Sequence, residues 1–411
     1  MAVDIENCPA LATLRTLFPV ELHQRIFLVG GAVRDLLLGK ESADLDLVVA
    51  LPEKELTCRR FRKVTPQDAP AILIYHSPTL GKIEATCIAD LTEMESDLRR
   101  RDFTVNALAL NLQGQLHDPL GGRENLTSRT LVPCSATTFS ADPTRLFRAF
   151  RFAADGWNLA PETVKLIEQE EWNEHVRRLP IERFSAEMIK AFSQKDPARF
   201  FVLMLQFDVG RTVLPEIFRM PQVPAGPLEH HPEGDLFIHS CQVLEEMVTR
   251  TDQALPRFCA FFHDLGKLAT DPSLYPKHHG HDDAGFDLAI PFCNRLSLPA
   301  AWRKALAWSS RLHGPANRWE ETRDSTRIRM AEGAIKGGIA DFLPLLAAAD
   351  WPEGPGMPDW PLALAAARMS SAELGITTEQ LEKLAAAEKG SLILQKRVEW
   401  FRRARGGDKR M

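Results

Sequence analysis

The sequence predicts an α+β protein, with a mixed sheet and helices in an N-terminal head and helices alone after it. Short apolar runs of strand character, IFLVGG, DLDLVVA and AILIYH, occur between about residues 25 and 120, with a helical segment, AVRDLLLG, that ends at Gly39. From about residue 140 onward the strand signals stop, and segments such as PTRLFRAFRFAADG have apolar residues at helical spacing. A chain of 411 residues is too long for one hydrophobic core, so we expect two to four domains.

Changes in composition indicate where these domains end. A stretch rich in proline and glycine, FRMPQVPAGPLEHHPEGD, places a boundary near residue 225, and a second one, DWPEGPGMPDWP, follows residue 350. We therefore expect an α/β head at 20–135, a helical neck and body at 136–225, a further helical domain at 226–355, and a helical tail at 356–411.

Composition indicates a globular protein that is not exported. The chain is 45% hydrophobic and 26% charged, which is typical of neither disordered nor collagenous proteins. Its seven cysteines form no CxxC pair, which favours a reducing compartment, so we expect the cytoplasm. The N-terminus has no basic segment followed by an apolar one, and no segment approaches the length of a membrane span. We therefore expect neither export nor a membrane partner.

The charge pattern is compatible with local contacts to nucleic acid. A net charge of −5 argues against a protein that coats nucleic acid nonspecifically. Basic runs nevertheless occur as CRRFRK, LRRRDF, RLFRAFRF and RVEWFRRARGGDKR. Phosphate contacts and solvated helix faces both explain such runs.

Two aspartates, Asp44 and Asp46, alternate with leucines inside an expected strand. Side chains alternate across a strand, so both carboxylates are expected on one face. Unpaired, they would repel each other, and a divalent cation would neutralise both. Mg²⁺ is the natural candidate because it joins protein carboxylates to substrate phosphates. A solvent-facing strand explains the pair equally well when it is taken alone.

A glycine pair, Gly30 and Gly31, precedes the aspartates. It permits a sharp turn after the first strand, and the helix that follows directs free N–H groups towards a phosphate. Arg34, on the first turn of that helix, is within reach of the same phosphate. An ordinary turn between a strand and a helix also has this pattern. The joint occurrence of both motifs favours a nucleotide-transfer site.

The stretch LVGGAVRDLLLG followed by DLDLVV resembles the signature of the class II tRNA nucleotidyltransferase and bacterial poly(A) polymerase family, in the polymerase-β superfamily. DLRRRDFTVNALAL, LHDPLGGRENL and ADPTRLFRAFRFAA are similar to its later motifs, in the same order. The resemblance implies a polymerase-β-like head and metal-dependent transfer of CMP and AMP from CTP and ATP to the 3′-hydroxyl of an immature or damaged tRNA, with release of pyrophosphate. It also implies nucleotide binding by Arg101, Arg148 and Arg151.

Asp142 and Arg145 are the candidates for choosing the base. Three positions apart, they are expected on one face of a helix that begins at Pro143. The carboxylate accepts from the amine of cytosine or adenine, and the guanidinium donates to the neighbouring ring nitrogen. Uracil and guanine present the opposite pattern and would leave buried groups unpaired. The alternative is an N-capping Asp142 followed by a basic helix face.

Two departures from the family leave the product open. The family usually has glutamate where this chain has Ala141. Between the strand GKIEATCIAD and RRRDF this chain has only LTEMESDL, where CCA-adding and poly(A) enzymes have a longer flexible loop. The shortened segment resembles enzymes that add only the two cytidines. CCA addition, CC addition and poly(A) synthesis therefore remain alternatives. Glu84, in GKIEAT, is a candidate third catalytic acid or an exposed strand glutamate.

A second constellation follows the order H…HD…D, with His239, His263, Asp264 and Asp350. Imidazoles and carboxylates suit a second divalent or transition metal that activates water for phosphate-ester hydrolysis. The segment resembles the HD phosphohydrolase domain, which implies phosphatase or 2′,3′-cyclic phosphodiesterase activity. KHHGHDD adds three auxiliary histidines near the expected mouth of the site: His278, His279 and His281.

Other functions and the assembly state stay open. HD hydrolysis as the principal activity, with a head that only binds RNA, is an alternative of a different class. A nitrogen-signalling uridylyltransferase also joins these two domain types, but it needs regulatory domains for which 411 residues leave little room. The sequence predicts no particular oligomeric state.

Overall fold

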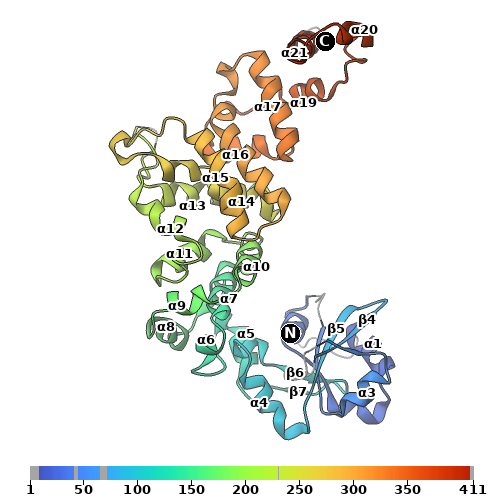
Figure 1. The fold of residues 1–411 in the computed structure, drawn as a ribbon. Helices are drawn as coiled ribbons and strands as arrows, with labels where there is room; N and C mark the ends of the chain where they lie inside the picture. The colour runs from blue at the N-terminus through green and yellow to red at the C-terminus, as the bar shows by residue number, and fades with distance from the viewer. Residues whose placement is uncertain (1–8, 41–44, 65–71, 230, 408–411) are drawn as a thin grey trace. The chain divides into compact units, whose positions relative to one another are not determined.

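The computed structural model describes residues 9–40, 45–64, 72–229 and 231–407. The chain divides into two compact units, Met1–Glu171 and Trp172–Met411. The first contains the sheet and the second is helical (Figure 1), so the α+β class is confirmed. The finer division into four domains stays a prediction.

The first unit alternates short helices and strands. Its strands are β1 (Ile26–Val29), β2 (Leu45–Val49), β3 (Arg62–Lys63), β4 (Ile72–Ser77), β5 (Gly81–Cys87), β6 (Ala109–Asn111), β7 (Leu116–His117), β8 (Thr130–Leu131) and β9 (Asn158–Leu159). Its helices are α1 (Pro9–Leu17), α2 (Gly31–Leu37), α3 (Glu53–Thr57), α4 (Met94–Arg99), α5 (Gly122–Thr127), α6 (Thr138–Ala141), α7 (Thr144–Ala154) and α8 (Pro161–Glu168), with short 3₁₀ turns η2 (Val20–Arg25), η3 (Leu91–Glu93) and η4 (Thr104–Asn106).

Among the described residues, seven strands form one mixed sheet in the order β3-β4-β5-β2-β1-β6-β7. β2 and β5 run parallel, and the other neighbouring strands run antiparallel. Both faces of β1 are buried, because Ile26 and Leu28 belong to one hydrophobic cluster while Phe27 and Val29 belong to another. β1 therefore lies between two hydrophobic clusters.

The neck differs from the sequence prediction in one detail. Strand signals were expected to stop near residue 140, but β9 pairs in parallel with β8 in a separate two-stranded sheet. Such a two-residue strand is too short to produce a periodic pattern. The pairing joins the end of the head to the segment after α7.

The second unit is built from helices packed around aromatic side chains. Phe201 stacks on Phe261 with ring centroids 4.2 Å apart, and Phe192 and Phe258 pack edge to face at 5.6 Å. Its helices are α9 (Asn173–Arg177), α10 (Ile181–Ala191), α11 (Ala198–Gln206), α12 (Pro215–Arg219), α13 (Leu236–Val248), α14 (Ala254–Phe262), α15 (His281–Arg295), α16 (Ala300–Asn317), α17 (Asp324–Gly337), α18 (Leu343–Asp350), α19 (Trp360–Arg368), α20 (Thr378–Glu382) and α21 (Ala386–Gly407), with 3₁₀ turns η5 (Met220–Gln222), η6 (Leu265–Ala269), η7 (Pro272–Leu274) and η8 (Trp319–Glu321).

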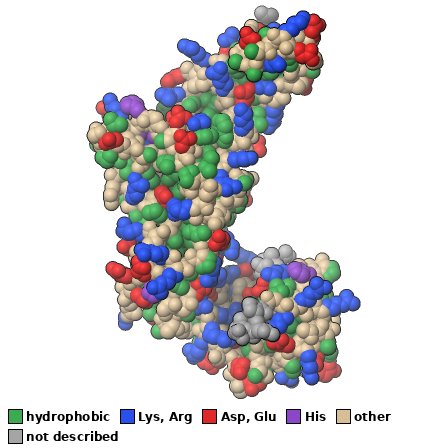
Figure 2. Space-filling model, in the orientation of Figure 1, with side chains coloured by type: hydrophobic (Ala, Val, Ile, Leu, Met, Phe, Trp, Pro, Cys, Tyr) green, Lys and Arg blue, Asp and Glu red, His purple; other side chains and the backbone are tan. Residues whose placement is uncertain are grey.

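The basic run in α21 is largely paired with acids. Arg402 and Arg405 contact Asp324 at 2.6 and 3.2 Å, and Arg397 pairs with Glu332. Basic and acidic side chains are interspersed over the visible face of this unit (Figure 2). This run therefore contributes to packing α21 against α17.

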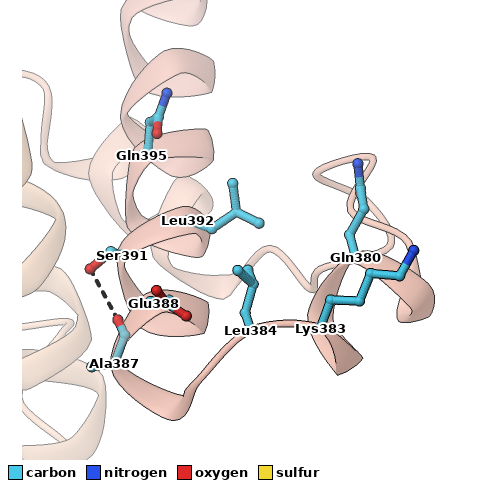
Figure 3. A pocket seen from close by; sticks show the side chains of 8 residues that line it. All are labelled: Gln380, Lys383, Leu384, Ala387, Glu388, Ser391, Leu392 and Gln395. Carbon is cyan, nitrogen blue, oxygen red and sulfur yellow. Dashed lines mark hydrogen bonds between the residues drawn. The ribbon is translucent and has the colours of Figure 1, made fainter.

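The helical tail has a surface hollow. A hollow of about 660 Å³ lies between α20 and α21, where Leu384 and Leu392 are flanked by polar side chains (Figure 3). It contains no cluster of metal-ligating or nucleophilic groups among the residues that line it. In the described ranges, no helix is long and apolar enough to cross a membrane.

Candidate active site and a buried metal cluster

Asp46 is the exposed residue of β2, whose other residues are all buried. In the parallel pairing of β2 with β5, Glu84 is its register partner, so both side chains leave the sheet on the same face. Glu84 also forms an ion pair with Lys82. Asp44, predicted to share this face, lies outside the described residues. The structure therefore brings Asp46 and the candidate third acid side by side.

Gly30 forms the turn between β1 and α2. Its φ of 73° and ψ of −140° are rarely adopted by residues with a side chain. A Cβ atom at this position would lie 2.8 Å from Nη1 of Arg101 and 3.6 Å from Oδ2 of Asp46. Gly31 then begins α2. The turn therefore places bare backbone, a carboxylate and a guanidinium together.

Arg34, in α2, is held firmly at the same edge. Its Nη1 donates to Oδ1 of Asn106 at 2.7 Å, and its Nε and Nη2 donate to Oδ1 of Asp35 at 2.9 and 2.8 Å. The guanidinium also lies 5.2 Å from the ring centroid of Phe152. A guanidinium has five N–H donors, so this geometry orients the group without using all of them.

Asp102 joins two of the predicted arginines, although the sequence analysis did not single it out. Its Oδ1 accepts from Nδ2 of Asn106 at 2.9 Å, and its Oδ2 accepts from Nε of Arg148 at 2.8 Å. Burial alone would raise the pKa of Asp102, but the Arg148 guanidinium and the hydrogen bonds from Asn106 and Phe103 outweigh it and lower that pKa. Because Asn106 also binds Arg34, one network runs from α2 to α7. The signal was present in LRRRDF, where an acid follows three arginines.

Arg101 follows α4 and lies beside Gly30. Its Nη2 is 3.4 Å from Oδ2 of Asp97, and its buried Nε has no hydrogen-bond partner among the described residues. Buried polar groups are normally satisfied, so an orphaned guanidinium N–H indicates a place for a ligand atom.

The base-selecting pair is arranged differently from the expectation. Helix α7 begins at Thr144, and Asp142 precedes it in extended conformation with φ −153°. Its Oδ1 accepts from the backbone N–H of Thr144 at 3.1 Å, so Asp142 does not share a helix face with Arg145 and acts as a cap. The prediction of one helical face was wrong, because α7 starts only after Pro143 and Asp142 lies outside the helix in extended conformation.

Arg145 is oriented by backbone carbonyl groups. It donates to the carbonyl oxygens of Arg100 at 2.6 Å, of Arg101 at 3.3 Å and of Thr138 at 3.2 Å. A cavity of about 640 Å³ lies beside it, within the range of small-molecule sites. Residues from α4 and from the segment before α7 line the cavity: Thr92, Glu95, Ser96, Arg99, Arg100, Ser135, Thr137, Ala141 and Arg145.

Arg151 lies one turn beyond Arg148 on α7. Its guanidinium lies 4.6 Å from the ring centroid of Phe152. The predicted arginines therefore occupy α2, the end of α4 and α7.

Four predicted metal ligands meet in the second unit. His239 is in α13, His263 caps the C-terminus of α14, Asp264 follows it, and Asp350 ends α18. The Nε2 atoms of both histidines lie 3.2–3.4 Å from Oδ2 of Asp264 and Oδ1 of Asp350. All four side chains are nearly inaccessible to solvent. The spacing H…HD…D therefore folds into one compact cluster.

A second imidazole pair faces the other oxygen of Asp264. Its Oδ1 lies 3.3 Å from Nε2 of His281 and 3.3 Å from Nε2 of His313. The sequence analysis named His281 but missed His313, whose only signal is a histidine within the helical run RLHGPAN. Asp264 thus lies between two pairs of imidazoles, and the cluster has donor groups for two ions bridged by one carboxylate.

The other auxiliary histidines have different roles. His278 is buried and bonds Oγ1 of Thr270 at 3.0 Å and the carbonyl of Pro224 at 2.8 Å, whereas His279 is exposed. Among the described residues neither belongs to a group that could hold a metal ion. Lys267 contacts Oδ2 of Asp264 at 2.6 Å.

The charges in this cluster depend on one another. Burial alone would lower the pKa of His263, but Asp264 and Asp350 outweigh it and raise that pKa to about 9. Burial would raise the pKa of Asp264, but Lys267 and His263 hold it well below its usual value. Nε2 of His239, Nε2 of His263 and Oδ1 of Asp264 are buried and have no hydrogen-bond partner in the part of the chain that the structure describes. These orphaned donor atoms fit a metal ion.

Comparison with known proteins identifies the family. The chain is 35% identical over 348 residues to the multifunctional CCA protein of Methylococcus capsulatus. The aligned region covers 79% of this chain and 81% of that protein. The chain belongs to the CCA-adding enzyme and poly(A) polymerase family. The family's poly(A) polymerase head domain matches residues 26–69 and 55–132, and the domain described as the probable RNA and SrmB-binding site of polymerase A matches 156–220.

Other members of the family agree. The multifunctional CCA protein of Tolumonas auensis is 35% identical over 326 residues, 74% of this chain and 78% of its own. A solved structure of the Thermotoga maritima CCA-adding enzyme complexed with tRNA has a TM-score of 0.65 at 20% identity and covers 96% of this chain and 92% of its own. A CCA-adding enzyme complexed with CTP has a TM-score of 0.66 at 18% identity, covering 96% and 92%. These two structures establish the fold.

Proposed function

We propose that this chain is a tRNA nucleotidyltransferase that transfers CMP and AMP from CTP and ATP to the 3′-hydroxyl of tRNA and releases pyrophosphate. The observation that supports it best is the convergence of Asp46, Gly30 and Arg101 at the end of the central strand β1. The names of its relatives agree: multifunctional CCA proteins, and CCA-adding enzymes solved with tRNA, CTP and ATP.

We assign Mg²⁺ to the carboxylate of Asp46, with Glu84 as its neighbour on β5. Asp44, which lies outside the described residues, stays the sequence's candidate for the second carboxylate. The chemistry of these side chains fits, because Mg²⁺ prefers oxygen ligands and Asp46 and Glu84 are neighbours on parallel strands. When bound, the ion polarises the α-phosphate and favours the deprotonated 3′-hydroxyl. The remaining steps depend on this chain's own side chains.

The arginines bind and orient the triphosphate. Nη1 of Arg101 lies beside Gly30, and its Nε has no partner among the described residues. Arg34, in α2, is fixed by a hydrogen bond to Asn106 of η4. The missing side chain at Gly30 allows a phosphate to approach the backbone closely. Arg148 and Arg151 extend the row of positive charge along α7. Together they place the α-phosphorus for in-line attack.

Asp142 and Arg145 are proposed to select the base. The carboxylate would exchange its capping bond to Thr144 for the exocyclic amine of cytosine or adenine. Arg145 already points its guanidinium along the wall of the cavity beside α4. Three backbone carbonyls hold it there, which supplies the orientation that Ala141 does not provide.

CC addition alone is a second candidate, and a specific observation favours it. After β5 ends at Cys87, only η3 and the six-residue α4 lie between the sheet and Arg101. This segment is short where the family has a flexible loop, as the sequence already indicated. The assay must therefore separate CC from CCA.

Incubation with tRNA that lacks its CCA end, and with one labelled nucleotide at a time, tests the proposal. We expect CMP incorporation by the wild-type protein and none by Asp46→Ala, and AMP incorporation once CTP is also present. No incorporation at all would overturn the proposal. CC products that never gain AMP would favour the second candidate, and a long A tail would indicate a poly(A) polymerase.

The buried cluster supports a separate hydrolytic activity. We assign a divalent or transition metal to His239, His263, Asp264 and Asp350, where it would activate water for hydrolysis of a phosphomonoester or a 2′,3′-cyclic phosphate. His263→Ala should abolish metal-stimulated hydrolysis of 2′,3′-cyclic CMP and leave nucleotide addition intact. Hydrolysis at the wild-type rate in His263→Ala would contradict this assignment.

A further inference from the structure

We propose that Glu233 is a positioning residue that fixes the ring and tautomer of His239 for the metal ion in the buried cluster. This inference rests on the proposed hydrolytic metal site and adds a residue that the H…HD…D pattern does not contain. Glu233 lies in the segment before α13, away from the cluster's own helices.

The hydrogen bonds of Glu233 define which nitrogen of His239 faces the cluster. Its Oε1 lies 2.9 Å from Nδ1 of His239, and the two side chains are 8% and 6% exposed. An ionised carboxylate can only accept a hydrogen bond, so Nδ1 of His239 donates and is the protonated nitrogen. The lone pair of Nε2 is then directed at Asp264 and Asp350, 3.4 and 3.2 Å away. Such a carboxylate–histidine contact makes the imidazole a stronger metal ligand.

The segment that contains Glu233 forms a loop whose start, at Pro224 and Ala225, is bonded to residues near the cluster. The N–H of Ala225 donates to the carbonyl of Gly234 at 2.9 Å and closes the segment into a loop. Lys267, which also contacts Asp264, donates to the carbonyl of Ala225 at 2.6 Å. His278 bonds the preceding carbonyl of Pro224 at 2.8 Å. The start of the loop is therefore joined to Lys267, and its end is bonded back to its start at Ala225, which restrains the segment that contains Glu233.

His231 is the outer partner of the same carboxylate. Its Nδ1 lies 2.9 Å from Oε1 of Glu233, and its side chain is 25% exposed. A Cβ atom at Gly226 would lie 2.3 Å from Cδ2 of His231, so the ring packs directly on the glycine backbone. The order from the surface inward is therefore His231, Glu233, His239 and the cluster.

A different reading is that these three residues bind an ion themselves, because their donor atoms lie within 4.8 Å of one another. The hydrogen bonds favour positioning. Nδ1 of His231 and Nδ1 of His239 both have Glu233 as a partner. Nε2 of His239 is buried and has no hydrogen-bond partner among the described residues. The orphaned atom is the one that faces Asp264 and Asp350.

Titration of the full chain with Co²⁺, followed by calorimetry and by the absorption spectrum of the bound ion, tests the inference. All proteins have Asp46→Ala, so that the head contributes little to the signal. We expect Glu233→Ala to weaken Co²⁺ binding by about 10- to 100-fold. Glu233→Gln should weaken Co²⁺ binding less than Glu233→Ala does, because the amide oxygen still accepts a hydrogen bond from Nδ1 of His239. Glu229→Ala, which removes an exposed carboxylate from the same loop, is the matched control and should bind as the parent does.

The outcomes separate this inference from the proposed metal site. Co²⁺ binding by Glu233→Ala at the parent affinity, while His263→Ala loses it, would overturn the role of Glu233 alone. Loss in His231→Ala as large as in His263→Ala would also overturn it, in favour of a site formed by the three residues themselves. Parent-like binding by His263→Ala, or no binding by the parent, would overturn the metal site and the inference with it. Glu233→Gln keeps the side-chain volume and serves if the alanine variant does not fold.

Discussion

Replacing Gly30 by alanine tests whether the turn after β1 builds the nucleotide-transfer site. The new Cβ would lie 2.8 Å from Nη1 of Arg101, whereas ordinary contacts begin at about 3.4 Å, so the guanidinium must move by about 0.6 Å. A misplacement of 1 Å at an active site costs on the order of 100-fold in rate. We therefore expect kcat/KM for CMP addition to fall by about 10- to 100-fold.

Gly39→Ala is the matched control for backbone strain. Gly39 has φ 70°, close to the 73° of Gly30, but a Cβ atom there meets no described residue within 4 Å. Alanine at either position costs about 1–3 kcal/mol of backbone strain, which lowers the thermal midpoint by several degrees in both variants. Initial rates with tRNA lacking CCA and labelled CTP, measured well below both midpoints, isolate the effect on the site. Equal rates for Gly30→Ala and Gly39→Ala would refute the reasoning.

The other predictions concern the two polar networks. Asp102→Asn should destabilise the chain by about 1–3 kcal/mol at pH 7, because it removes the charge that binds Arg148. In the folded protein the pKa of the Asp102 carboxyl is lower than its ordinary value. The stability that this carboxylate provides is therefore fully present above the ordinary pKa and is lost as the pH falls through the folded pKa. Thermal melts should therefore show the gap between Asp102→Asn and wild type shrinking below pH 4, and a constant gap contradicts this. Arg145→Ala should reduce the preference for CTP over UTP by about 10- to 100-fold in competition assays, and unchanged preference removes Arg145 from base selection. His313→Ala should lower the number of Co²⁺ ions bound by one if Asp264 bridges two ions, and unchanged stoichiometry argues for a single ion.

The sequence predicted the head and the metal cluster well, because their chemistry depends on closely spaced residues. The strands before Gly30 and around Asp46 have a clear apolar pattern, and the turn between them needs glycine. H…HD…D was sufficient to predict one cluster although Asp350 is 86 positions after Asp264. In each case the residue types are unusual for their local structure.

What the sequence did not predict depends on tertiary contacts. Asp102 and His313 lie in ordinary-looking segments, and only folding places them between functional groups. Asp142 was expected to share a helix face with Arg145, with capping as the alternative. The choice depends on where the helix begins, which the sequence leaves uncertain by one or two residues. The sequence also gives no signal for the role of Glu233, because its contact with His239 depends on a loop that backbone hydrogen bonds close.

The central claim is that the chain extends tRNA by template-free selection of nucleotides. The most direct measurement is sequencing of tRNA 3′ ends after incubation of tRNA lacking CCA with the wild-type protein and all four nucleotides at equal concentration. The account predicts ends that gain CC or CCA and exclude U and G, and no extension by Asp46→Ala. Unextended ends, or extension that includes all four bases, would contradict it.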